Sequence, residues 1–160
     1  MSNVHFEGAG FLSRAYVENM FQGTISISDS KGVVYREVLF PALELAAQMH
    51  VWLLACDGKE FRFSTASSDI VGLVRIRPEG NRWVIGSCEV GVRDSEAVEW
   101  MEIASVVESF ISDVADRLDE RGFDPRFYLY APWEQTSMLK PRVPCGCYFS
   151  EPCTMCLERK

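Results

Sequence analysis

The sequence has little of what most enzymes use for acid–base and nucleophilic chemistry. Its two histidines, His5 and His50, leave few groups for a Ser–His or Cys–His pair. The glycine-rich phosphate-binding motifs, the H-E-x-x-H zinc motif and the G-x-S-x-G nucleophile motif are absent from it. No pair of carboxyl groups is singled out by an apolar environment as an acid and a base. We therefore expect a non-enzymatic protein and interpret His50 as a core histidine.

Long hydrophobic runs and an excess of positive charge are also missing. No apolar run approaches the about 18 residues that a membrane-spanning helix needs, and the start MSNVHFEGAG has no signal-peptide pattern. Sixteen Lys and Arg against 23 Asp and Glu give a net charge of −7. This charge opposes binding to nucleic acid and to anionic membranes. The sequence therefore predicts a soluble, cytoplasmic protein with a basic protein as its partner.

Length and composition predict one globular domain with a short appendage. The chain has 160 residues, of which 48% are hydrophobic, and domains commonly contain about 100 to 200 residues. We expect a single domain over residues 1–131 and a Pro/Cys-rich tail over residues 132–160. Four prolines oppose regular structure in this tail.

Hydrophobic periodicity predicts an α+β fold with the element order ββαβββαβ. The expected elements are a hairpin over residues 21–40, a helix from Pro41 to the turn at Asp57-Gly58, strands over 61–65, 70–77 and 83–90, a long helix over 96–121 and a last strand over 127–130. The short connections imply antiparallel pairing, so we expect a mostly antiparallel sheet of about five strands. The first helix is apolar on more than one side and is predicted to be buried.

The long helix predicted over residues 96–121 is amphipathic. We expect Asp94 or Ser95 to cap its start and Gly122 to end it. One stripe of the helix is apolar and is expected to pack on the sheet. The stripe consists of Trp100, Ile103, Val107, Phe110, Ile111, Val114 and Leu118.

The same helix carries charge equal to the net charge of the whole chain. Residues 96–120 contain eight acidic side chains and one basic side chain, which leaves 15 of each sign elsewhere. The candidate partner-binding residues on its outer face are Glu99, Glu102, Asp113, Asp116 and Glu120. Concentrated charge steers a partner of opposite sign, so this face predicts docking of a basic protein. The alternative is an acidic helix face that is simply solvated.

A second unusual feature is the cysteine cluster PCGCYFSEPCTMC. Cys145, Cys147, Cys153 and Cys156 form a C-x-C and a C-x-x-C pair, which in principle supply four thiolates to one structural Zn²⁺. Disulfides and free thiols remain as alternatives, and a zinc-stapled adaptor that binds its partner through the tail is the second functional hypothesis. We expect the remaining cysteines, Cys56 and Cys88, to be buried free thiols.

Several arginines gather in the predicted strands. They are Arg62, Arg75, Arg77 and Arg82. We expect them to solvate an open sheet face and to pair with carboxylates such as Glu60, Glu79 and Glu89. A weaker alternative is a site for single-stranded nucleic acid, and a third is a small enzyme that uses these arginines on an anionic substrate.

The run LFPALELAAQMHVWLLA, followed by FRFSTASS, carries a resemblance. Its matching residues are Phe40, Pro41, Glu44, Leu45, Ala46, Trp52 and Leu53. It resembles small bacterial proteins of unknown function that share a hairpin, a Phe-Pro-x-x-Glu-Leu-Ala helix and a β-meander, over roughly residues 21–120. By class, the chain also resembles immunity proteins of bacterial toxin systems. That resemblance implies a protein that occupies the basic cleft of a toxin with an acidic surface.

Overall fold

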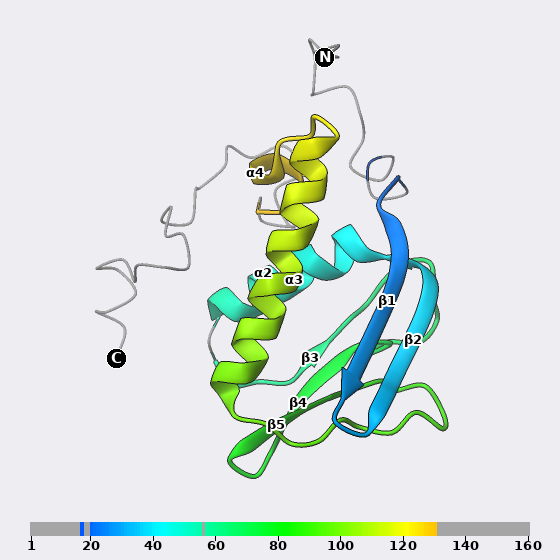
Figure 1. The fold of residues 1–160 in the computed structure, drawn as a ribbon, viewed down its shortest axis with the longest axis vertical. Helices are drawn as coiled ribbons and strands as arrows, with labels where there is room; N and C mark the ends of the chain where they lie inside the picture. Colours follow the sequence, from blue (N-terminus) through cyan, green and yellow to red (C-terminus); the bar gives the residue numbers. More distant parts are fainter. Residues whose placement is uncertain (1–16, 18–19, 56, 131–160) are drawn as a thin grey trace, which may run out of the picture. The chain divides into compact units, whose positions relative to one another are not determined.

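The computed structural model describes residues 17, 20–55 and 57–130 and confirms the α+β class. The chain divides into two units, Met1–Tyr130 and Ala131–Lys160, and all described residues belong to the first. Its elements are β1 (Gln22–Asp29), β2 (Gly32–Pro41), α2 (Ala42–Ala55), β3 (Phe61–Arg62), β4 (Arg75–Glu79), β5 (Arg82–Gly86), α3 (Trp100–Glu120) and α4 (Pro125–Tyr128) (Figure 1). In the described part of the chain, no helix combines the length and the apolarity that crossing a membrane requires.

The five strands form two small antiparallel sheets, where the sequence suggested a single sheet (Figure 1). β1 and β2 form the predicted hairpin, and β3, β4 and β5 form a meander in that order. The strands predicted over residues 70–77 and 83–90 are shorter than expected. Gly72 has a φ of 92°, and a Cβ at this position would lie 2.7 Å from Cys88 Sγ. The backbone N–H of Cys88 still donates to the carbonyl of Gly72 at 2.8 Å, although the regular pairing of β4 with β5 stops at Arg75 and Gly86.

Strand β2 contains two bulges that turn its side chains. The register with β1 shifts between Gly23 and Ile25 and again between Ile27 and Ser28, and each shift inserts one extra residue into β2. Leu39, at the first bulge, has a φ of 56° and is 73% exposed. The next residue, Phe40, is 2% exposed. The bulge thus directs Phe40 into the core at the cost of an unfavourable backbone angle at Leu39.

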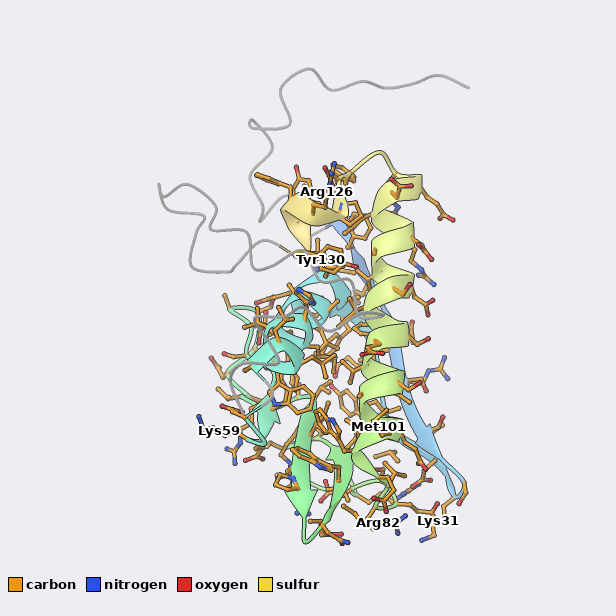
Figure 2. All side chains as sticks on the ribbon, turned by 90° about the vertical axis from the view of Figure 1, so that its left-hand side faces the viewer. Lys31, Lys59, Arg82, Met101, Arg126 and Tyr130 are labelled. Carbon is orange, nitrogen blue, oxygen red and sulfur yellow. The ribbon has the colours of Figure 1, made fainter. Side chains whose placement is uncertain are left out.

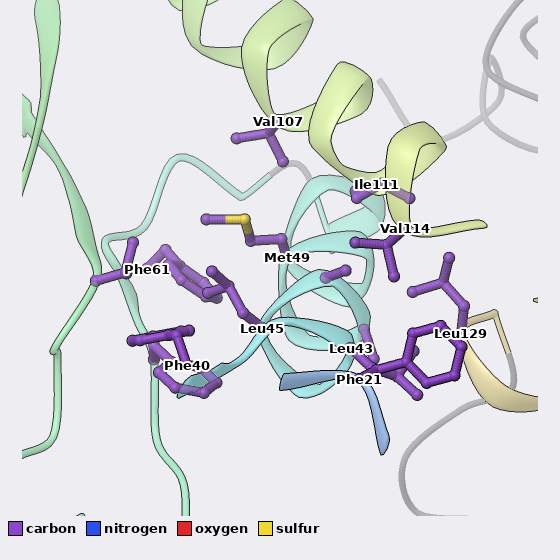
Figure 3. Packing of buried hydrophobic residues seen from close by; sticks show 14 of the residues in the cluster. Phe21, Phe40, Leu43, Leu45, Met49, Phe61, Val107, Ile111, Val114 and Leu129 are labelled. Atoms are coloured by element: carbon purple, nitrogen blue, oxygen red, sulfur yellow. The ribbon is translucent and has the colours of Figure 1, made fainter. Parts of the chain in front are cut away.

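Helix α2 lies at the centre of the hydrophobic core. Its buried residues come from several sides of the helix, as predicted, and are Leu43, Leu45, Ala46, Ala47, Met49, His50 and Leu53. Figure 3 shows Leu45 and Met49 between Phe61 of the meander and Val107 of α3. The apolar stripe of α3 packs mainly on α2, so the expectation that it packs on the sheet is wrong. Because the strands form two separate small sheets, α2 offers the larger apolar surface.

Helix α3 begins at Trp100, later than the predicted residue 96. The preceding segment is extended because it pairs with β5 through a bridge between Trp83 and Val98, whose two backbone N–H···O distances are 2.8 and 2.9 Å. Glu99 is the N-cap residue. The long helix is therefore shorter by one turn, and its first turn lies next to the end of the meander.

Helix α4 replaces the last predicted strand. Residues 127–130 do not form a strand, because Asp124 and Pro125 begin a helix just before them. The Asp124 carboxylate accepts a hydrogen bond of 2.9 Å from the backbone N–H of Arg126, and proline suits the first helical position. Within the apolar run at residues 127–130, Tyr128 and Leu129 are buried, whereas Phe127 is 54% exposed.

Candidate functional site

Four of the five predicted partner-binding residues form one line along α3. Glu102, Asp113, Asp116 and Glu120 are all exposed and lie within an arc of about 60° at 100° per residue. We call these four residues the acidic stripe. Figure 2 shows the side chains of α3 that project away from α2, on the side of the helix opposite the core. The fifth residue, Glu99, lies at the N-cap, where its Oε1 is 3.2 Å from Arg82 Nε.

The acidic stripe lies on a helix with a large excess of negative charge, in which Arg117 is the one basic side chain. Within residues 17, 20–55 and 57–130, no ion pair involves any of its four carboxylates. The nearby Arg121 instead donates to the carbonyl of Met20 and lies over the ring of Phe21. A hollow on this face is lined by Asp113, Asp116, Arg117, Glu120 and Arg121. The stripe is thus an exposed acidic surface on a rigid helix.

A groove runs between β1 and α3, beside the acidic stripe. It has a volume of about 440 Å³, and we call it the β1–α3 groove. Its walls are half-buried or exposed apolar residues, and its floor reaches the buried side chains of α2. Its lining residues include Ile25, Ile27, Leu45, Met49, Glu102, Val106 and Phe110. The groove therefore joins the core to the N-terminal end of the stripe.

One end of the groove is closed by a cluster of charged groups that we call the clasp. The Asp29 carboxylate accepts hydrogen bonds of 2.7 and 2.8 Å from Arg93 and bonds of 2.9 and 3.0 Å from the backbone N–H groups of Lys31 and Glu96. Glu96 in turn accepts from Ser30 and pairs with Lys31. The clasp fixes the turn of the β1–β2 hairpin to residues 93–96, which sets the width of the groove at this end.

The clasp also makes the hairpin sensitive to acid. The bidentate hydrogen bond from Arg93 holds the pKa of Asp29 well below its ordinary value. The hydrogen bond from Ser30, followed by that from Lys31, lowers the pKa of Glu96. A carboxylate with a lowered pKa stabilises the fold at a pH above its unfolded pKa, and this stability is lost as the pH falls toward the folded pKa. The clasp should therefore loosen below about pH 4.

Replacing Asp29 with asparagine is expected to release the hairpin turn at neutral pH. Asparagine has one side-chain oxygen and no charge. It therefore cannot accept both hydrogen bonds from Arg93, and the ion pair is lost. We expect amide hydrogen exchange in residues 28–32 to become about tenfold faster, while amides of α2 keep their rates. Exchange measured by NMR tests this. Asp69→Asn, at an exposed acidic residue with no ion pair in the described structure, is the control. Equal exchange rates in the turn of Asp29→Asn and the control would contradict the role of the clasp.

The region that matches a protein-family model includes both the stripe and the groove. Residues 13–120 match the model of a family described as a domain of unknown function, DUF7878. The chain belongs to the DUF7878 family. The match ends at Glu120, so the DUF7878 region contains all of α3, while α4 lies beyond it. No curated protein and no solved structure matches the chain significantly.

The arginines of the DUF7878 meander are paired with acidic side chains. Arg62 and Arg75 pair with Glu60, Arg77 pairs with Glu79, and Arg82 pairs with Glu99. The predicted pairing with Glu60 and Glu79 is confirmed. Glu89 pairs with none of the four arginines.

The central acidic group of this meander, Asp94, was not predicted as a partner. Its two carboxylate oxygens accept hydrogen bonds of 2.9 Å from Arg75 and 2.7 Å from Arg77. The prediction that Asp94 or Ser95 caps the long helix is wrong. The carboxylate lies over Gly86, where a Cβ would be 2.1 Å from Asp94 Oδ1. The glycine makes room for the carboxylate between the two arginines.

Three tryptophans of the DUF7878 domain form a cluster that sequence reasoning missed. Trp100 lies with its ring centroid 5.4 Å from Trp52 and 4.9 Å from Trp83. The Trp52 indole N–H donates to the carbonyl of Lys59 at 2.8 Å. The three residues are far apart in the sequence, so no local pattern joins them. The cluster connects α2, the meander and the first turn of α3.

The predicted zinc ligands Cys145, Cys147, Cys153 and Cys156 lie outside the described residues, so their role remains a prediction. Among the described residues, no group of three or more His, Cys, Asp or Glu side chains has the arrangement of a metal site. Cys88 is a half-buried free thiol. Cys56 also lies outside the described residues. His50 is buried in the core, and burial lowers its pKa.

Proposed function

We propose that this protein is a non-enzymatic bacterial binding protein that docks a basic protein on its acidic stripe, in the manner of an immunity protein that neutralises a basic toxin in the cytoplasm. The observation that carries the proposal is the exposure of four carboxylates in one line, none of which forms an ion pair within the described residues. A solvated surface commonly has charges of both signs interspersed. The arginines of the meander follow that rule, because each is paired with a carboxylate.

The rigidity of the stripe supports the same proposal. The stripe belongs to a helix whose opposite face is anchored in the core by Ile103, Val107, Ile111, Val114 and Leu118. The helix therefore holds the carboxylates at a fixed spacing. Little conformational entropy is lost when a partner binds them. Attraction between the stripe and a basic cleft accelerates association, and this acceleration declines as salt rises.

Charge reversal of the stripe tests the proposal. We expect Asp113→Lys combined with Asp116→Lys to weaken partner binding about 20-fold, because it replaces two attractive interactions with two repulsive ones. The partner is captured at low salt from a lysate of the source bacterium, purified and titrated by calorimetry against each variant. Co-expression of the partner and the protein then shows whether a toxic activity is neutralised.

The matched control is Asp69→Lys combined with Glu89→Lys. These two residues are also exposed and lie outside the stripe, so the control has the same net charge as the test variant. The control should bind the partner as the wild type does. Equal loss of affinity in both variants would indicate a response to net charge alone and contradict the proposal. Full affinity of the Asp113→Lys, Asp116→Lys variant would also contradict it.

A further inference from the structure

Strand β1 presents a free edge to the β1–α3 groove. β1 pairs on one side with β2, and the hairpin is a sheet of two strands. Among the described residues, no backbone hydrogen bond joins residues 22–28 to any element other than β2. Six consecutive residues, 25–30, line the groove, so the backbone itself forms part of its wall. An unpaired strand edge offers N–H and C=O groups to a further strand.

The other edge of the hairpin is less suited to pairing. β2 carries both extra residues of the two bulges, and Leu39 has a left-handed backbone conformation. Bulges interrupt the regular spacing of N–H and C=O groups and protect strand edges from additional strands. β1 has no extra residue of its own, and its burial alternates regularly from Gln22 to Asp29. The regular edge is thus the one that faces the groove.

The groove also offers an apolar surface beside one unpaired charge. Ile25 and Ile27 of β1 face the groove together with Val106 and Phe110 of α3. Glu102 lines the groove and belongs to the acidic stripe, whereas the other carboxylates at the clasp end are engaged by Arg93, Ser30 and Lys31. This combination disfavours an anionic ligand and favours a segment with both aliphatic and basic side chains.

We propose that the β1–α3 groove binds an extended segment of the basic partner, which adds as a strand to the free edge of β1. Alternate side chains of a strand point to opposite faces. Side chains two residues apart therefore share a face, so an aliphatic side chain of the segment enters the groove between Ile27 and Val106 and a lysine or arginine two residues away lies beside Glu102. The inference rests on the proposed function, because it names the part of the partner that the acidic stripe guides to the groove.

The test uses the acetylated peptide Ser-Val-Ser-Lys-Ser, in which the valine and the lysine share one strand face, and NMR of the full chain. We expect chemical-shift changes at residues 25–28 and 106, together with slower hydrogen exchange of β1 amides, because new strand bonds protect them. The peptide Ser-Ser-Ser-Lys-Ser, with the same charge and no apolar side chain, should cause no chemical-shift changes in the groove.

Val106→Lys is the decisive variant, and Val38→Lys is its control. Val106 is 59% exposed in the groove wall, and Val38 is 62% exposed on β2, outside the groove. We expect Val106→Lys to lower the affinity for the valine-containing peptide by about tenfold, because it places a second cation beside the bound lysine. Val38→Lys should bind it as the wild type does. Circular dichroism establishes that both variants are folded.

The outcomes separate this inference from the proposed function. Shifts confined to residues 113–120 would support docking on the acidic stripe and overturn strand addition in the groove. Shifts in the groove that are unaffected by Asp113→Lys and Asp116→Lys would support the groove and contradict a role of the stripe. Equal binding to Val106→Lys and Val38→Lys, or the absence of any shift at residues 25–28 and 106 at millimolar peptide, would overturn the groove site.

Discussion

Replacement of Phe40 with alanine is expected to lower the free energy of unfolding by about 4 kcal/mol. Phe40 is almost fully buried, and its ring centroid lies 5.2 Å from that of Phe63. The side chain joins the end of the hairpin to the meander and to α2. Its removal loses the transfer energy of the ring and leaves a cavity among side chains that cannot collapse into the space.

Chemical denaturation followed by tryptophan fluorescence measures this loss. Val38→Ala, at an exposed position two residues away in the same strand, should change the free energy of unfolding by less than about 0.5 kcal/mol. A loss below about 1 kcal/mol for Phe40→Ala would show that the bulge at Leu39 does not direct this ring into an essential part of the core.

The parts of the fold that follow from local sequence pattern were predicted correctly. Alternating side chains around residues 29–32 identified the hairpin, and apolar residues on several sides of residues 42–55 identified a buried helix. The end of α3 at Gly122 follows from its φ of 79°, which glycine tolerates best. Each of these features depends on neighbours within one or two turns of chain, so periodicity is sufficient to find it.

The wrong secondary-structure predictions concern segments whose conformation is determined by tertiary contacts and not by the local sequence pattern. The segment before α3 has helical composition, yet its pairing with β5 through Val98 keeps it extended. Residues 127–130 have strand composition, yet the Asp124-Pro125 start places Phe127 and Tyr128 in a short helix. Two small sheets in place of one also depend on strand order, which no pattern in the sequence encodes.

Only one part of the candidate site, the acidic stripe, could be predicted from the sequence. The acidic stripe lies on one helix, so its members recur at spacings of 11, three and four residues, which are close to whole numbers of helical turns and can be recognised in the sequence. The β1–α3 groove is formed by residues such as Ile27 and Val106 that are remote in the sequence, and the clasp joins Asp29 to Arg93 in the same way. No periodicity connects such residues, and only the fold brings them together.

Replacing Asp94 with asparagine is expected to destabilise the fold by about 2 to 3 kcal/mol near pH 7. Asp94 is the shared acceptor of Arg75 and Arg77, and all three side chains are largely withdrawn from solvent. Asparagine keeps the shape but removes the charge and turns an N–H group toward one arginine. Two guanidinium groups then lose their common counter-charge at the surface of the meander.

The dependence of this effect on pH identifies its electrostatic origin. Burial opposes ionisation of Asp94, but hydrogen bonds from Arg77 and Arg75 outweigh it, so the pKa of Asp94 lies below its ordinary value. The stability that Asp94 adds is therefore fully present above its unfolded pKa and declines as the pH falls below about 4. Urea denaturation of the wild type and Asp94→Asn should show a difference in unfolding free energy that is constant from about pH 5 to 7 and narrows toward pH 3. Asp69→Asn, at an exposed residue, should match the wild type throughout. If the difference keeps its full size at the acidic end, loss of shape and not loss of charge would account for the destabilisation.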